Sequence, residues 1–338
     1  MIKEAINALV SGNSLNFEQS AAVMAEIMGG EATPAQIAAF VTALRIKGET
    51  VEEIAGLASV MREKAVPVKA TPPLIDTCGT GGDNSSTINV STAAAFVAAG
   101  AGLKVAKHGN RAMTSKCGSA DVLEALGVKI ELNAEAVAEC LEKVGIGFMF
   151  APLFHPAMKH AAGPRREIGI RTVFNILGPL TNPARARFQV IGVPDKELGQ
   201  KIAAVLHRLG TKHSLVVHGL DGMGELSISG PSVFWEVNER GVLPPSELNP
   251  AAFGLAKTSV SEIKGGTPEE NAGILRRVFN GEKGPARDVV VLNAAAAIYA
   301  GNLASDLKEG MQLAKTAIDR GQAREKLEGL IELSQKLG

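Results

Sequence analysis

The chain has 338 residues, enough for two domains or one large one. Hydrophobic residues make up 46% and charged residues 21%, as is typical of a globular protein, and the 35 basic and 35 acidic residues cancel. A general nucleic-acid binder usually carries a basic excess, so this balance disfavours that class. Three cysteines without metal-ligand spacing argue against a disulfide framework. We find neither a membrane-spanning run nor a signal-peptide core, and therefore expect a cytoplasmic protein.

The first seventy residues predict helices only. Asn16 with Gln19, and Thr50 with Glu53, have the spacing of a capping box at a helix N-terminus. Thr33 before Pro34 marks a third helix start. Such short helices bury little alone, so we expect their apolar faces to pack on the rest of the chain or on a second subunit.

After the "TPP" segment (71–73), apolar runs alternate with helical stretches. The strand-like runs are "LIDTC", "LKVAKHG", "GFMFAP", "FQVIGV" and "SLVVHG". This alternation predicts βαβ units and a mostly parallel sheet. "SVFWEV" (232–237) predicts a strand of a different sheet or an edge hairpin, and "DVVVLNAAAAIYAG" (288–301) is too apolar to be exposed. We therefore predict an α/β fold class, with a small all-helical domain over 1–70 and a larger α/β domain over 71–338.

The segment "DTCGTGGDNSSTINVST" (76–92) combines three glycines with a run of hydroxyl and amide side chains. It follows a predicted strand and precedes a predicted helix. Glycines let backbone N–H groups approach an anion, and the helix N-terminus adds partial positive charge. The pattern is neither the dinucleotide fingerprint nor the nucleoside-triphosphate loop. A loop that merely turns is the plain alternative, but the residue types favour a phosphate site.

A second loop supports this interpretation. "LKVAKHGNRAMTSKCGSAD" (103–121) places five basic groups between Lys104 and Lys116, among glycines and hydroxyls. A basic run is commonly a solvated surface, but this mixture can bind several phosphate oxygens at once. Two such loops predict a ligand with two separated phosphate groups.

Together these segments resemble a known family. "GTGGD", "NVST", "KHGNR", "GSADVLEALG" and "HPAMKHAAGPRREIGIRTVFNILGPLTNP" are similar to signature segments of the anthranilate phosphoribosyltransferases, and the similarity continues in order through "NAAAAIYAGN" and "GQAREKLEGL". The family transfers phosphoribose from 5-phosphoribosyl 1-diphosphate to the amine of anthranilate in tryptophan biosynthesis. The resemblance implies a nucleoside phosphorylase-like fold whose helical domain gains helices from about 155–185, a site at the hinge, and a homodimer formed through the helical domain.

The resemblance also implies site residues. Positions matching the sugar-donor site are Gly79, Gly82, Asp83, Thr87, Asn89, Val90, Ser91, Thr92, Lys107, His108, Gly109, Asn110, Arg111, Ala112, Met113, Thr114, Ser115 and Ser119. Positions matching the anthranilate site are Gly79, Asn110 and Arg165, and a guanidinium suits a carboxylate. His108, His155 and Pro179 line the same entrance. No side chain is assigned as a certain catalytic acid or base; Lys107 is expected to stabilise the leaving pyrophosphate.

Magnesium is the cofactor that the resemblance implies, with Ser91 and Glu225 as matching ligands. Here the chain departs from the family, because Gly224 stands where relatives usually carry an aspartate. Either water and phosphate oxygens complete the metal shell, or Asp221 substitutes, so one or two ions could bind. Ala112, often a serine, is a smaller departure.

Two rival functions remain to be weighed. A pyrimidine nucleoside phosphorylase has a similar fold and loops, but "KHGNR" together with Arg165 favours the transferase. A transferase-like nucleic-acid-binding protein predicts a basic excess and damaged loops, and this chain has neither. The expected partners are the two small-molecule substrates and a second copy of the chain, with no nucleic acid and no membrane.

Overall fold

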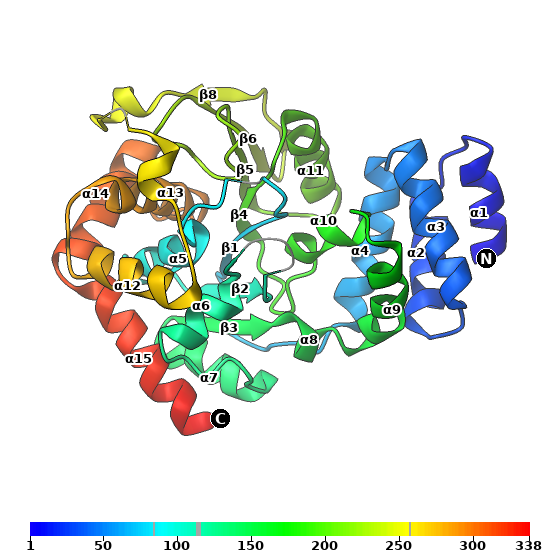
Figure 1. Cartoon of the computed structure of the whole chain (residues 1–338), viewed down its shortest axis with the longest axis horizontal. Helices are drawn as coiled ribbons and strands as arrows, with labels where there is room; N and C mark the ends of the chain where they lie inside the picture. The colour runs from blue at the N-terminus through cyan, green and yellow to red at the C-terminus, as the bar shows by residue number, and fades with distance from the viewer. Residues whose placement is uncertain (84, 113–115, 257) are drawn as a thin grey trace.

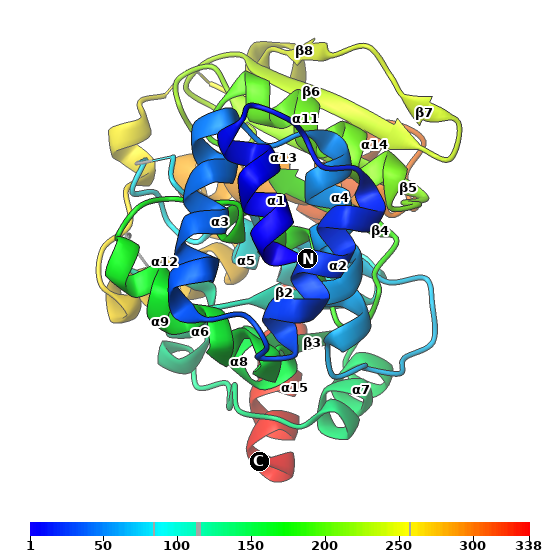
Figure 2. The ribbon, with the colours of Figure 1, turned by 90° about the vertical axis from the view of Figure 1, so that its right-hand side faces the viewer.

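The computed structural model describes residues 1–83, 85–112, 116–256 and 258–338. A helical bundle lies beside a sheet that carries helices on both faces (Figure 1). Figure 2 looks onto the bundle, with the sheet behind it. The predicted fold class is confirmed, with helices at the N-terminus followed by an α/β region whose sheet is mostly parallel.

The bundle begins with helices α1 (Ile2–Val10), α2 (Phe17–Met28), α3 (Pro34–Lys47) and α4 (Val51–Lys64). The predicted capping boxes are confirmed: the Asn16 side chain accepts from the Gln19 N–H, and that of Thr50 from the Glu53 N–H. A third box at Thr33 begins α3, with Pro34 as its first residue. Each box satisfies backbone donors that the first helical turn leaves unpaired, so the sequence fixes these three helix starts locally.

The sheet places five parallel strands in the order β3 (Ile146–Phe150), β2 (Val105–Gly109), β1 (Ile75–Gly79), β4 (Phe188–Gly192) and β5 (His213–Gly219). Antiparallel β6 (Ser232–Asn238) pairs with β5 and with the short strands β7 (Gly241–Val242) and β8 (Ser246–Leu248). The "SVFWEV" run is therefore an antiparallel strand of the same sheet. Because β1, β2 and β4 are parallel, they all end at one edge of the sheet.

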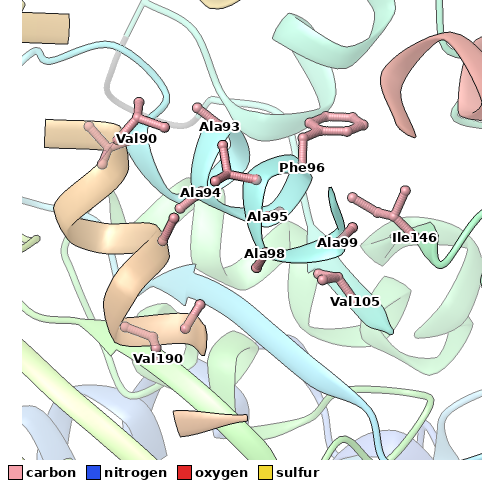
Figure 3. Close-up of a cluster of buried hydrophobic side chains, with 14 of the residues drawn as sticks. Val90, Ala93, Ala94, Ala95, Phe96, Ala98, Ala99, Val105, Ile146 and Val190 are labelled. Atoms are coloured by element: carbon pink, nitrogen blue, oxygen red, sulfur yellow. The ribbon is translucent and has the colours of Figure 1, made fainter. Parts of the chain in front are cut away.

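Helix α5 (Val90–Gly100) packs on one face of the sheet and against α13 (Pro285–Ala300). Figure 3 shows the alanines of α5 among Val105, Ile146 and Val190, which come from three strands. Small side chains let these helices approach closely, and α13 is buried as predicted. The same side of the sheet carries α6 (Ser119–Ala125), α7 (Ala134–Lys143), α12 (Pro268–Phe279), α14 (Leu307–Asp319) and α15 (Gln322–Leu337).

The opposite face of the sheet joins the bundle through α11 (Lys196–Arg208). Side chains alternate between the two faces of a strand, so Val190 packs with α5 while Ile191 belongs to the hydrophobic cluster of the bundle. That second cluster also takes residues from α9 (Lys159–Ile168) and α10 (Phe174–Leu177), which follow the short helix α8 (Ala151–Phe154). The sheet is thus the common wall of two hydrophobic clusters.

Within the described residues, no helix combines the length and the apolarity needed to span a bilayer.

A buried carboxylate connects three segments of the bundle. Glu53 is fully buried and accepts hydrogen bonds from the Leu15 N–H (2.9 Å), the Thr50 N–H (2.8 Å) and Lys47 Nζ (3.0 Å). Removing one partner of a buried ion pair leaves the other charge uncompensated.

We expect Glu53→Ala to lower the free energy of unfolding by about 3 kcal/mol, measured by urea denaturation. Glu52→Ala is the matched control, because Glu52 pairs with Arg208 in an exposed contact and should cost less than about 1 kcal/mol. Equal small losses in the two variants would contradict the role assigned to Glu53.

Candidate active site

Lys107 lies at the floor of the site, on strand β2 between β3 and β1. Its ammonium group donates to the Thr77 carbonyl of β1 and lies 3.5 Å from Ser91 Oγ at the start of α5. Burial lowers the pKa of Lys107, and the nearby carboxyl groups, Asp76 first and Glu225 after it, oppose that shift. The ammonium group of Lys107 can attract an anionic ligand, and the carboxylates around it can attract a cation that accompanies that ligand.

Asp76, the second residue of β1, holds the surroundings of Lys107 in place. Its carboxyl group accepts from the His108 N–H (3.3 Å) and from Asn182 Nδ2 (2.8 Å). Burial raises the pKa of Asp76 to about 6, with the charge of Lys107 as the main opposing influence. Sequence reasoning missed Asp76 and Asn182. A charged residue inside an apolar strand was the available signal for Asp76.

The glycine-rich loop turns at the end of β1. Gly82 has φ +85°, a conformation that favours glycine, and a Cβ added there would overlap the guanidinium group of Arg171. Arg171 donates to the Gly81 carbonyl at 3.0 Å. The loop thus lies under an exposed cation that sequence reasoning did not select, although Arg171 begins the quoted "RTVFN" run.

Two acidic side chains meet where the glycine-rich loop approaches the segment after β5. Asp83 Oδ2 accepts from the Gly224 N–H (2.9 Å) and from Ser85 Oγ (2.7 Å). Burial, and to a smaller extent the negative charge of Asp83, raise the pKa of Glu225 to about 8, and the positive charge of Lys107 opposes the shift. Glu225 Oε2 is buried and has no hydrogen-bond partner among the described residues. These residues fit a divalent cation, because such an ion would satisfy the unpaired oxygen and the neighbouring carboxylate together.

Asp221 is engaged elsewhere. Its carboxylate accepts from Ser227 Oγ and from the Met223 N–H (3.3 Å), so it stabilises its own turn. A Cβ added to Gly224 would instead lie 3.2 Å from Asp83 Oδ2. The structure therefore places Asp83, and not Asp221, opposite the position where a ligand was expected to be missing. In the described part of the chain, no three His, Cys, Asp or Glu side chains are arranged so that they alone could hold a metal ion.

The second loop, after β2, is tied to α6. Arg111 donates to Asp121 (3.2 Å) and Glu124 (2.9 Å), and the Ala112 N–H donates to Asp121 Oδ2 (2.9 Å). Ser119 Oγ donates to the Asn110 carbonyl at 3.3 Å. The guanidinium of Arg111 thus faces carboxylates in this structure. Met113, Thr114 and Ser115 lie outside the described residues.

Several predicted residues at the start of α5 face the protein interior. Asn89 accepts from Asn271 Nδ2 (2.8 Å) and donates to the Cys117 carbonyl (3.0 Å), which joins the two loops. Val90 belongs to the hydrophobic core. Val90 can meet a ligand only through its backbone, whereas Thr92 has a buried Oγ1 without a partner among the described residues.

The rings of His108 and His155 contact each other in a tilted arrangement, with centroids 5.0 Å apart and planes at 51°. Burial lowers the pKa of His108 to about 3 and that of His155 to about 4, so both rings are neutral at pH 7. His108 Nδ1 bonds the Gly178 carbonyl (3.1 Å), next to the buried Pro179. Neutral rings offer polar contact without adding charge to the site.

Arg165 belongs to α9 of the bundle. Its guanidinium lies over the Phe174 ring, 5.2 Å from the centroid, and burial lowers its pKa. Among the described residues it forms no salt bridge, so it can pair with an incoming carboxylate.

Unsatisfied polar atoms gather at this edge. Of nine buried side-chain atoms without a partner in the described residues, five belong to the residues around the two loops: Thr92, His108, His155, Thr172 and Glu225. Buried polar groups are normally paired, so such a cluster marks the position of a polar ligand.

A helical bundle beside an α/β sheet with this polar edge defines a class of transferase. Family models described as the a/b domain and the helical bundle domain of the glycosyl transferase family match residues 71–324 and 3–65. The chain therefore belongs to the glycosyl transferase family.

The relatives narrow the assignment. The anthranilate phosphoribosyltransferase of Dehalococcoides mccartyi is 60% identical over 100% of this chain and 99% of its own, and that of Chloroflexus aggregans is 58% identical over 99% and 98%. The crystal structure of the enzyme from Thermus thermophilus superposes with a TM-score of 0.92 at 45% identity, covering 98% of this chain and 99% of that one. A Saccharomyces cerevisiae structure, solved in complex with PRPP and Mg, gives 0.90 at 30% identity, covering 99% and 98%. The resemblance to the anthranilate phosphoribosyltransferases is confirmed.

The depressed pKa of His155 predicts acid sensitivity. The unfolded chain binds a proton at this residue near pH 6.5, whereas the folded chain binds it only near pH 4. The unfolded state therefore holds more protons between these values, and stability falls as the pH falls.

Between pH 6.5 and pH 4 the free energy of unfolding of the parent should fall by up to about 3 kcal/mol more than that of His155→Gln. The measurement is urea unfolding at several pH values. The exposed His207→Gln variant should keep the parent's pH dependence. An unchanged slope in His155→Gln would contradict a buried neutral imidazole.

Proposed function

We propose that the protein transfers phosphoribose from 5-phosphoribosyl 1-diphosphate to the amine of anthranilate, giving N-(5-phosphoribosyl)anthranilate and pyrophosphate in tryptophan biosynthesis. The observation that carries the proposal is the convergence of the Gly82 loop, Lys107 and Glu225 at one edge of a sheet in a chain 60% identical to a named anthranilate phosphoribosyltransferase. The yeast relatives solved with PRPP and Mg, and with 4-fluoroanthranilate, support both substrates.

The glycine-rich loop is proposed to bind the diphosphate of the donor. Backbone N–H groups around Gly82 and the N-terminus of α5 supply donors and partial positive charge, with Arg171 beside them. Lys107 lies below, next to Ser91. When the bond between the ribose carbon and the diphosphate oxygen breaks, these groups stabilise the charge on the departing pyrophosphate.

Anthranilate needs orientation more than activation. Its aromatic amine is a nucleophile while neutral: the nitrogen forms the new bond to the ribose carbon and then loses a proton. The rings of His108 and His155 are too weakly basic to take a proton early. Arg165 is proposed to hold the carboxylate, so positioning contributes the remaining rate enhancement.

Magnesium is proposed to bind at Glu225 and Ser91, with Asp83 as the carboxylate that takes the place of an aspartate at position 224. Bound there, the ion neutralises diphosphate charge as the leaving group departs. Asp83 approaches Gly224 so closely that a side chain at that position would crowd its carboxylate.

A homodimer formed through the bundle is proposed as well. Val10, Ile46, Leu153 and Ile170 are exposed apolar side chains of the N-terminal helices and of the α8–α10 region. Ile46, at the end of α3, is 82% exposed. A second copy would cover such residues.

The expected cytoplasmic location stays a prediction.

The direct test of the reaction is pyrophosphate release from the donor, measured with and without anthranilate. Release that depends on anthranilate supports the transfer. Release of free base from a pyrimidine nucleoside and phosphate would favour the phosphorylase instead.

Arg165→Ala should raise the KM for anthranilate ten- to a hundredfold and change the KM for the donor little, because a charge-assisted pair contributes roughly 1.5–3 kcal/mol. Arg166→Ala is the matched control, since Arg166 is the exposed neighbour on the same helix. Equal losses for both substrates would mean that Arg165 acts on the fold.

Asp83→Asn should weaken magnesium binding about tenfold, whereas Asp221→Asn should leave it unchanged. The measurement is a calorimetric titration of magnesium into protein mixed with donor, without anthranilate, so that no transfer occurs. The opposite result, with Asp221→Asn the weaker binder, would restore Asp221 as the substitute ligand.

A further inference from the structure

A cavity lined by arginines lies at the edge of the sheet opposite to the glycine-rich loop. It has a volume of about 420 Å³, and its walls come from α4 of the bundle, from the segment before β4 and from the segment between α11 and β5. Strands β1, β4 and β5 are parallel, so the cavity lies where β4 and β5 begin and the glycine-rich loop lies where β1 ends. None of the lining residues belongs to the predicted substrate or metal positions.

The cavity has an excess of positive charge. Its charged side chains are four arginines and one glutamate: Arg62, Arg185, Arg187, Arg208 and Glu63. Two of the arginines have carboxylate partners at exposed positions outside the lining, since Arg187 lies 3.5 Å from Glu239 and Arg208 lies 3.1 Å from Glu52. The other two arginines form no salt bridge in the described part of the chain.

Arg62 carries a charge that only carbonyl groups accompany. Its Nε donates to the Leu180 carbonyl, and its Nη1 lies 3.4 Å from the Leu209 carbonyl. Burial lowers the pKa of Arg62 to about 10, and the positive charge of Arg185 adds to the shift. Carbonyl oxygens satisfy donors without neutralising the charge, so the repulsion between the two guanidinium groups stays uncompensated.

Both of these guanidinium groups can be reached from solvent. Arg62 is half-buried, and its Nη2 forms no hydrogen bond with the described residues and is not among their buried unpaired atoms. Arg185 is exposed. Glu63 is exposed as well, and it forms no salt bridge with either arginine. One arginine of α4 and one of the segment before β4 therefore present donors to a ligand in the cavity.

The segment before β4 is held in an unfavourable backbone conformation. Arg185 has φ +52°, in the left-handed region that residues other than glycine adopt only at a cost. Its neighbour Arg187 donates through Nε (3.2 Å) and Nη2 (3.0 Å) to the Gly210 carbonyl, and Thr211 Oγ1 donates to the Arg187 carbonyl (2.9 Å). Strain that the surroundings hold in place is a common feature of ligand sites.

We propose that this cavity is a phosphate site, in which the anion binds between Arg62 and Arg185 and so joins the bundle to the α/β region. A phosphate group has several acceptor oxygens and more than one negative charge near pH 7, so it can pair with two guanidinium groups at once. A single carboxylate matches only one guanidinium group in the same way. The site does not depend on the proposed transfer reaction, because the two sites lie at opposite edges of the sheet.

Hydrogen exchange read by mass spectrometry tests the site with inorganic phosphate as the probe, at an ionic strength kept constant with sodium chloride. Phosphate should slow exchange in peptides covering 184–188 and 208–212. In Arg185→Met, half-maximal protection should need about tenfold more phosphate, because the variant removes a charge-assisted donor. Arg240→Met is the matched control, since Arg240 is exposed and does not line the cavity, and it should behave as the parent.

Arg62→Met tests whether the anion joins the two parts of the chain. It should weaken the protection by a similar factor, because Arg62 is the arginine that α4 contributes. If this variant does not fold, Arg185→Met decides alone. Unchanged protection in Arg185→Met, or none in the parent at millimolar phosphate, would overturn the site. A folded Arg62→Met with the protection of the parent would overturn the connection to the bundle.

Two other anions, used at the same ionic strength, define the ligand. Acetate should protect these peptides far less than phosphate, and equal protection by acetate would overturn the assignment to a phosphate group. Ribose 5-phosphate distinguishes the two sources of that group: stronger protection than by phosphate identifies a phosphate ester, and weaker protection identifies the free anion. If pyrophosphate release fails while the protection persists, the proposed function is wrong and the phosphate site stands.

Discussion

The active-site edge depends on one buried ammonium group, that of Lys107. It lies between β1 and the start of α5, within hydrogen-bonding reach of both, and negative charges on Asp76 and Glu225 oppose the effect of its burial. A charge this deep is costly unless its surroundings compensate it. Strand β1, the glycine-rich loop and the segment after β5 are therefore arranged around one cation, and the proposed diphosphate and metal positions follow from it.

Glycines permit this arrangement. A Cβ at Gly192 would overlap the carbonyl of Gly224, so the end of β4 and the segment carrying Glu225 can touch only because Gly192 lacks a side chain. The same contact places the Gly224 N–H on Asp83. The position that departs from the family pattern, Gly224, thus lies directly against Asp83 of the glycine-rich loop. On its other side that loop pairs with Ile263 and Lys264.

Contacts between distant segments explain which site residues the sequence missed. Arg171, Asn182 and Asp76 are far apart in the chain, and each acts by holding another group: the Gly81 carbonyl, the Asp76 carboxyl and the His108 N–H. Such roles depend on three-dimensional proximity that residue type and spacing do not encode. The residues of the two loops could be predicted from the sequence because each loop is one continuous segment. In the structure, however, the side chains of Asn89 and Arg111 bond to other protein groups.

By itself the sequence determined the local features of this protein. Capping boxes at Asn16 and Thr50, the alternation of strands with helices, and glycines after β1 are short-range patterns whose physical causes lie within a few residues. The tertiary structure alone decided the pKa values near 3 and 8 at His108 and Glu225 and the hydrogen bond from the Gly224 N–H to Asp83. Burial and charge proximity produce these properties, and both arise only when segments far apart in the chain pack together.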